Sequence, residues 1–101
     1  MSNIVIIGSG PAGVSAALYA ARAGVQITVL TKGPGALDRA ELIQNYYGFA
    51  EPIAGAELER RGIEGAKAVG VEFVTTEAVG LTYTDKLTVE TLAGAFPADA
   101  V

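Results

Sequence analysis

Residues 3–13 read NIVIIGSGPAG, and this stretch decides the fold. Its first five residues form an apolar, β-branched run, which is typical of a strand buried on both faces in a parallel sheet covered by helices. A Gly-x-Gly-x-x-Gly turn follows at Gly8, Gly10 and Gly13. In such a turn the first glycine permits a tight bend, the second lets a ligand approach the backbone, and the third lets a helix pack closely. Pro11 suits the first turn of that helix.

The residues after the turn complete a β-α-β unit. The alanine-rich residues 12–23 favour a helix, and Gly24 is placed to end it. Residues 26–31 form a second β-branched run. This arrangement is typical of a site for the pyrophosphate of a dinucleotide, because the helix N-terminus presents free N–H groups and a partial positive charge. The alternative is that the glycine turn only connects the strand to the helix and binds no ligand.

The end of the second strand lacks the acidic residue that usually holds the ribose of a dinucleotide. Thr31 occupies that position and Lys32 follows it. The Thr31 hydroxyl can hydrogen-bond a ribose more weakly than a carboxylate would, or Thr31 can be an ordinary β-branched strand residue. Lys32 can be a solvated charge, or it can contact a 2′-phosphate and thereby select NADP.

Composition and charge exclude several classes of site. The chain has 101 residues, which fits one domain or part of one, and its net charge of −4 with a pI of about 4.6 argues against nucleic-acid binding. It contains no cysteine and no histidine, so it offers no thiol nucleophile, no thiolate metal site and no histidine base. No apolar run is long enough for a signal sequence or a membrane span, so we expect a cytoplasmic protein that binds no membrane.

The remaining residues predict that the α/β fold continues. Residues 32–55 have no regular period, and a stretch of this length is usually functional or disordered. We expect a helix over 56–69, with Leu58, Ala66 and Val69 in its apolar stripe and Glu57 paired with Arg61 one turn on. Four more strands are expected, the first in the parallel sheet and the others in antiparallel hairpins, over 71–74, 78–83, 87–92 and 96–101.

The sequence resembles the N-terminal part of the FAD domain of the small pyridine nucleotide-disulfide oxidoreductases, the thioredoxin reductase group. The resemblance begins with residues 4–13, including the Pro-Ala between the second and third glycines. It is most specific at residues 45–49, Asn-Tyr-Tyr-Gly-Phe, which precede a helix that opens with Gly55 and Leu58. Ordinary NAD dehydrogenases have no such segment. Residues from Gly70 onward resemble the third strand and the β-meander of the family.

This resemblance implies a Rossmann-like FAD/NAD(P)-binding domain, with residues 1–101 as its N-terminal segment. The glycine turn would hold the FAD pyrophosphate, the end of the second strand the adenosine ribose, and the loop at 33–37 with Asn45 the flavin side. Asn45 can instead be a structural turn residue. The backbone near Ala78 would meet the adenine. The implied cofactor-binding residues are Gly8, Ser9, Gly10, Pro11, Ala12, Gly13, Thr31, Lys32, Gly35, Leu37, Asn45 and Ala78.

Two departures from the family pattern concern the flavin side. The family loop is commonly Gly-Gly-Gln-Leu, whereas residues 34–37 read Pro-Gly-Ala-Leu, so Ala36 lacks the glutamine amide that would hydrogen-bond the flavin. The loop between Thr31 and this motif is also short. The redox-active Cys-x-x-Cys of the family lies in a second, NADPH-binding domain. Because the chain stops inside an apolar run, we expect it to be part of a longer protein.

The resemblance favours an FAD-dependent oxidoreductase that passes electrons from NAD(P)H, or another donor, through FAD to a disulfide. A thioredoxin-like protein would be its partner, and the sequence identifies neither a catalytic residue nor a metal site in this chain. Two alternatives stay open, namely a nucleotide-binding module without turnover and an NADP-binding Rossmann domain. We also expect a homodimer or another self-association, because an unpaired strand edge and apolar surface would be exposed.

Overall fold

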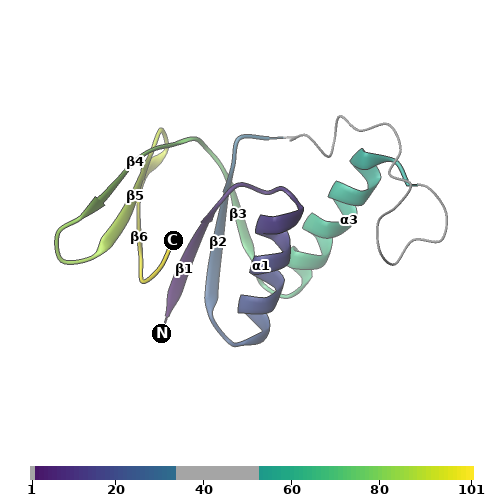
Figure 1. Ribbon diagram of the computed structural model, residues 1–101, viewed down its shortest axis with the longest axis horizontal. Helices are drawn as coiled ribbons and strands as arrows, with labels where there is room; N and C mark the ends of the chain where they lie inside the picture. Colours follow the sequence, from purple (N-terminus) through teal and green to yellow (C-terminus); the bar gives the residue numbers. More distant parts are fainter. Residues whose placement is uncertain (1, 34–52) are drawn as a thin grey trace.

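The computed structural model describes residues 2–33 and 53–101, and it confirms a mixed α/β fold. Over these residues the chain forms two helices, one parallel sheet and one antiparallel sheet (Figure 1). The elements are β1 (Asn3–Ile7), α1 (Pro11–Arg22), β2 (Gln26–Thr31), α3 (Gly55–Ala68), β3 (Glu72–Thr75), β4 (Ala78–Tyr83), β5 (Leu87–Thr91) and β6 (Gly94–Ala98). Neither described helix is long and apolar enough to cross a membrane.

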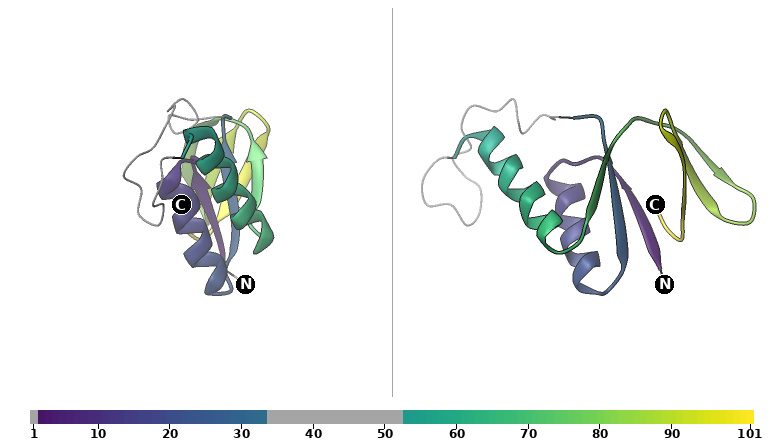
Figure 2. Two further views of the ribbon diagram at one scale, coloured as in Figure 1. Left: turned by 90° about the vertical axis from the view of Figure 1, so that its right-hand side faces the viewer. Right: turned by 180° about the vertical axis from the view of Figure 1, so that it is seen from behind.

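The parallel sheet has the strand order β1-β2-β3, and the antiparallel sheet has the order β4-β5-β6. Figure 2 shows that α1 and α3 lie on one side of the parallel sheet, whereas the antiparallel β-meander lies on the other side. The sequence predicted a first strand covered by helices on both faces. Helices cover only one face of the parallel sheet, as predicted for that face, and the β-meander covers the other.

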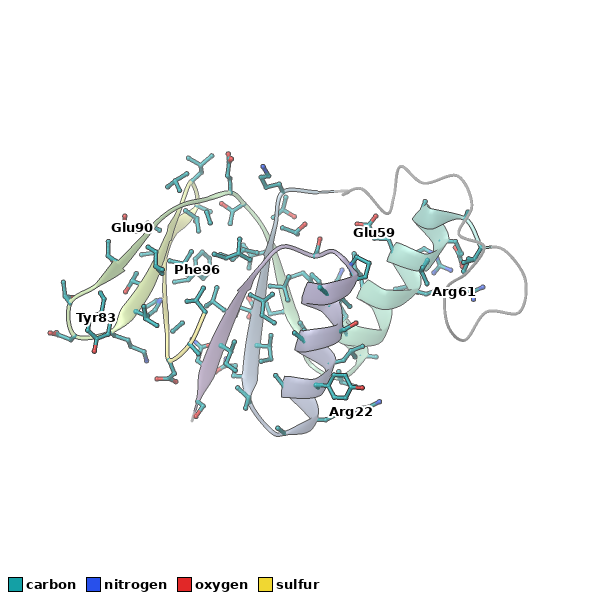
Figure 3. The ribbon with its side chains drawn as sticks, viewed as in Figure 1. Arg22, Glu59, Arg61, Tyr83, Glu90 and Phe96 are labelled. Carbon is teal, nitrogen blue, oxygen red and sulfur yellow. The ribbon has the colours of Figure 1, made fainter. Side chains whose placement is uncertain are left out.

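Two apolar clusters hold these layers together. The first lies between the helices and the parallel sheet, and its fully buried members are Ala17, Val29 and Ala66. The second lies between the parallel sheet and the meander, around Val5 and Val89; Phe96 of β6 packs against it (Figure 3). Successive side chains of a strand point to opposite faces, so neighbouring residues of β1 and β2 serve different clusters.

The residues after β6 return to β1 and pair with its free edge. The Val5 N–H donates to the Ala100 carbonyl oxygen at 3.0 Å, and the Asp99 N–H donates to that of Asn3 at 2.8 Å. The Asn3 N–H in turn donates to the Asp99 carboxylate at 2.7 Å. This hydrogen bond, aided by the charge of Lys86, lowers the pKa of Asp99. Strand β1 is therefore hydrogen-bonded along both edges.

Several predicted boundaries were displaced by one to three residues. The clearest error concerns Leu92, which was assigned to a strand but lies in the turn between β5 and β6 and is 75% exposed. The turn forms there because Gly94 has a φ of +127°, which suits glycine, and because the Thr91 hydroxyl accepts a hydrogen bond from the Ala93 N–H at 3.0 Å. Strand β6 consequently begins two residues earlier than predicted and ends at Ala98.

Helix α1 can approach the sheet closely because Gly13 has no side chain. A Cβ atom at this position would overlap the carbonyl oxygen of Gly8 and would also touch the side chain of Ile6. The helix ends as predicted, with Gly24 at a φ of +83° directly after the cap residue Ala23.

Helix α3 differs from the prediction in one apolar position. Leu58 and Ala66 are buried as expected, but Val69 is the C-cap residue and is 49% exposed. Ile63 packs against the first cluster. On the solvent side, Glu57 pairs with Arg61 at 2.9 Å, as predicted.

We predict that replacing Gly13 by alanine destabilises the fold. The added methyl group overlaps backbone that cannot swing away, so we expect a loss of about 1–3 kcal/mol in the free energy of unfolding. Gly65→Ala in α3 is the matched control, because its Cβ meets no atom within 4 Å. That variant should gain about 1 kcal/mol through better helix propensity. Denaturant unfolding measures both values, and a Gly13→Ala protein as stable as the wild type would contradict the packing described.

A second prediction concerns the Glu57 carboxyl group. Hydrogen bonds from Arg60 and Arg61 lower its pKa from 4.5 to about 2. A carboxyl group whose pKa is lowered by folding stabilises the fold above its unfolded pKa, and this contribution disappears as the pH falls from about 4.5 through about 2. Carboxyl-detected NMR titration should place the Glu57 midpoint well below 4.5. A midpoint at 4.5 or above would refute the prediction.

Candidate functional site

The carboxyl ends of the three parallel strands meet at one edge of the sheet and line a cavity of about 580 Å³. Ligands of open α/β sheets bind at this edge, and the volume lies within the range of about 300–1,000 Å³ that small-molecule sites occupy. Three short segments provide the lining, one at the carboxyl end of each strand. The lining residues are Ile7, Gly8, Ser9, Gly10, Leu30, Thr31, Lys32, Gly33, Thr76, Glu77 and Ala78.

The glycine turn has the backbone geometry that its pattern predicted. Gly8 has a φ of +108°, and its N–H donates to the Leu30 carbonyl oxygen at 2.8 Å, which ties the turn to the end of β2. Gly10 is extended, with a φ of −70°, and a Cβ built on it would meet no atom within 4 Å. The space beside the Gly10 backbone is therefore open to a ligand, whereas the space beside Gly13 is filled by the turn itself.

The N-terminus of α1 adjoins this open space. Within the described part of the chain, no side chain caps the helix, and its first intrahelical bond runs from the Val14 N–H to the Gly10 carbonyl oxygen at 3.0 Å. Pro11, at the first helical position, has no N–H to satisfy. The N–H groups of Ala12 and Gly13 remain as donors at the positive end of the helix, which favours an anionic group.

A hydrogen bond between two hydroxyl groups links the turn to the end of β2. The Ser9 and Thr31 hydroxyl oxygens lie 2.7 Å apart, and Ser9 is buried. The Thr31 hydroxyl also accepts a hydrogen bond from the Gly33 N–H at 3.1 Å. Thr31 thus fixes the position of the turn relative to β2, and its hydroxyl is already engaged by protein groups.

Lys32 and Glu77 form an ion pair at the cavity, with 3.7 Å between the ammonium nitrogen and the nearer carboxylate oxygen. Both side chains are at least half exposed, at 74% and 51%. The sequence prediction included Lys32 but missed Glu77. The signal that could have found Glu77 is its place two residues after the third parallel strand, because the carboxyl ends of parallel strands share one edge.

Two buried oxygen atoms beside the turn lack hydrogen-bond partners among the described residues. One is the hydroxyl oxygen of Thr76, a residue that lines the cavity. The other is Oε2 of Glu59 on α3, whose side chain lies near the start of α1 (Figure 3) and lines two smaller cavities together with Ser9. Unpaired buried polar atoms are costly, so they mark positions where a ligand group can supply the missing hydrogen bond.

The structure brings six of the predicted site residues together around one cavity. These are Gly8, Ser9, Gly10, Thr31, Lys32 and Ala78. Pro11 lines a neighbouring cavity of about 130 Å³, and Ala12 and Gly13 belong to the first turn of α1. The predicted residues Gly35, Leu37 and Asn45 lie outside the described residues. Among those that are described, no group of three or more acidic side chains could hold a metal ion.

Comparisons with known proteins show the family to which the chain belongs. Residues 2–100 match the pyridine nucleotide-disulphide oxidoreductase family. The thioredoxin reductase of Aquifex aeolicus is 43% identical over 79 residues, which cover 76% of this chain and 24% of that protein. The thioredoxin reductase of Streptomyces clavuligerus is 40% identical over 97 residues, which cover 91% of this chain and 30% of that protein.

Solved structures show the same relationship. The thioredoxin reductase of Gloeobacter violaceus superposes with a TM-score of 0.91 at 32% identity, covering 96% of this chain and 32% of that one. The atypical thioredoxin reductase of Desulfovibrio vulgaris Hildenborough gives a TM-score of 0.88 at 38% identity, covering 97% and 33%. The chain thus spans about a third of the solved relatives it matches. It belongs to the pyridine nucleotide-disulphide oxidoreductase family and is similar to the N-terminal part of the thioredoxin reductases within it.

Proposed function

We propose that the chain binds the adenosine diphosphate half of FAD and forms the FAD-binding part of a flavin-dependent oxidoreductase. The observation that carries this proposal is the open space at Gly10 beside the uncapped N-terminus of α1. A diphosphate is the anionic group that this combination of close backbone approach and free N–H donors suits best.

The residues of the cavity fit the rest of that half of the cofactor. The cavity extends from the turn to Ala78, so a diphosphate at Gly10 leaves room for a nucleoside between the ends of β2 and β3. The unpaired Thr76 hydroxyl is available there for a hydrogen bond. Gly35, Leu37 and Asn45 are proposed to serve the flavin side on the strength of the family resemblance alone.

In the intact protein the bound flavin would supply the redox chemistry, and this chain would position it. We propose that electrons pass from NAD(P)H, or another donor, to a protein disulfide, as the names of the thioredoxin reductase relatives suggest. The partner would then be a thioredoxin-like protein, and the location cytoplasmic. The described residues would bind and orient the cofactor, and none is assigned a catalytic role.

An NADP-binding site is the weaker alternative. It requires Lys32 to attract a 2′-phosphate, but Lys32 is paired with the carboxylate of Glu77 at 3.7 Å. A negative charge beside that position disfavours a second anion. The other alternative, a nucleotide-binding module without turnover, shares the cavity and differs only in the activity of the intact protein.

The test uses the full-length protein with Gly10→Val as the informative variant. The wild type should purify with bound FAD, visible in its absorption spectrum, and should reduce a protein disulfide with NAD(P)H. Gly10→Val should lose the flavin yet keep its fold, because the valine side chain fills the ligand space without meeting protein atoms near Cβ. Circular dichroism checks the fold of both proteins.

The outcomes separate the candidates. Flavin binding without disulfide reduction would favour the module, and tight binding of NADP instead of FAD would favour the second alternative. If the Gly10→Val protein holds FAD as well as the wild type does, the proposed position of the diphosphate is wrong.

Self-association, which the sequence led us to expect, stays a prediction. Leu81 and Tyr83 lie two residues apart on β4, beyond the register shift between Ala78 and Gly80, so they share one face of the meander, and they are 58% and 71% exposed. Exposed apolar strips of this kind favour association. Sedimentation velocity of the 101-residue chain should show association that increases with concentration and weakens in a Leu81→Lys variant. A monomer at every concentration would contradict the prediction.

A further inference from the structure

We propose that Glu77 holds the adenosine ribose and so replaces the acid that is missing from the end of β2. Carboxylates accept hydrogen bonds from the ribose hydroxyl groups in many dinucleotide sites, where they stand at the end of the second strand. Here the carboxylate would come from the segment that follows the third strand. This inference rests on the proposed function, because it assumes that an adenine nucleotide occupies the cavity.

The strand register brings Glu77 to the required place. Thr31, the last residue of β2, pairs with Thr75, the last residue of β3. The pairing continues one residue further, because the Thr76 N–H donates to the Thr31 carbonyl oxygen at 2.9 Å. Glu77 therefore emerges beside the end of β2, one strand away from the position that an acid usually takes.

The residues of β2 itself do not offer a comparable acceptor. The Thr31 hydroxyl is engaged by Ser9 at 2.7 Å and by the Gly33 N–H at 3.1 Å. The Lys32 ammonium group can donate hydrogen bonds but cannot accept them. Glu77 is the one acidic residue in the cavity lining, as far as the described residues go.

The ion pair with Lys32 orients the Glu77 carboxylate without closing it off. The contact uses Oε1 at 3.7 Å, and the Glu77 side chain is 51% exposed. A carboxylate accepts hydrogen bonds on both oxygens, and a ribose offers two adjacent hydroxyl donors, so the two groups are complementary. The same carboxylate would repel a 2′-phosphate, which gives Glu77 a role in choosing between nucleotides.

The experiment uses the full-length protein freed of its cofactor, with ADP, 2′-deoxy-ADP and 2′-phospho-ADP as calorimetric probes. The variant is Glu77→Gln, which keeps the size of the side chain and removes its charge. The control is Glu72→Gln, which makes the same change of charge at the opposite end of β3. We expect Glu77→Gln to bind ADP roughly tenfold more weakly, as the loss of a charge-assisted hydrogen bond implies, and Glu72→Gln to match the wild type.

Two affinity ratios, of ADP to 2′-deoxy-ADP and of ADP to 2′-phospho-ADP, make the result specific to the ribose. The wild type should prefer ADP over 2′-deoxy-ADP, and Glu77→Gln should lose most of this preference because the carboxylate that reads the 2′-hydroxyl is gone. The variant should also tolerate 2′-phospho-ADP better, since Lys32 is released from its partner. If Glu77→Gln keeps the affinity and both ratios of the wild type, the role of Glu77 is refuted and the proposed function stands. If the wild type binds neither ADP nor FAD, the proposed function itself is refuted, and the role of Glu77 falls with it.

Discussion

The contact between Gly13 and the carbonyl oxygen of Gly8 is the constraint on which the site depends. Because a side chain at Gly13 would overlap that oxygen, α1 can begin this close to the end of β1 only with glycine there. The close start places the uncapped N-terminus of α1 beside the open backbone at Gly10. Helix packing and the proposed anion binding therefore depend on the same few atoms, so a change that alters the packing would also move the proposed anion site.

The second requirement is that three strand ends stay in register. The Gly8 N–H is bonded to the end of β2, and the Thr76 N–H is bonded to Thr31, so the segments that line the cavity are tied pairwise by backbone hydrogen bonds. The Ser9–Thr31 hydroxyl pair adds a side-chain link between the first two segments. The threonine at the end of β2 thus has a structural role, and the absence of an acid at that position does not argue against a nucleotide site.

The β-α-β unit was predictable from sequence because its signals are local. The β-branched runs, the glycine spacing and Gly24 each specify a backbone conformation within a few residues. Leu92 was assigned wrongly because it looks like a strand residue, although it lies in the tight turn between the paired strands β5 and β6. Other features depend on long-range pairing: the Ser9–Thr31 bond joins residues 22 positions apart, and Glu77 reaches the site only through the register of β2 with β3.

The central claim, that the turn and the N-terminus of α1 hold the diphosphate, is tested most directly by mapping amide shifts. The backbone amide signals of isotope-labelled protein would be followed by NMR during titration with ADP. We expect the largest shifts at Ser9, Gly10, Ala12 and Gly13, since their N–H groups surround the proposed diphosphate position. Largest shifts in the β-meander or in α3, with the signals of the turn unchanged, would contradict it.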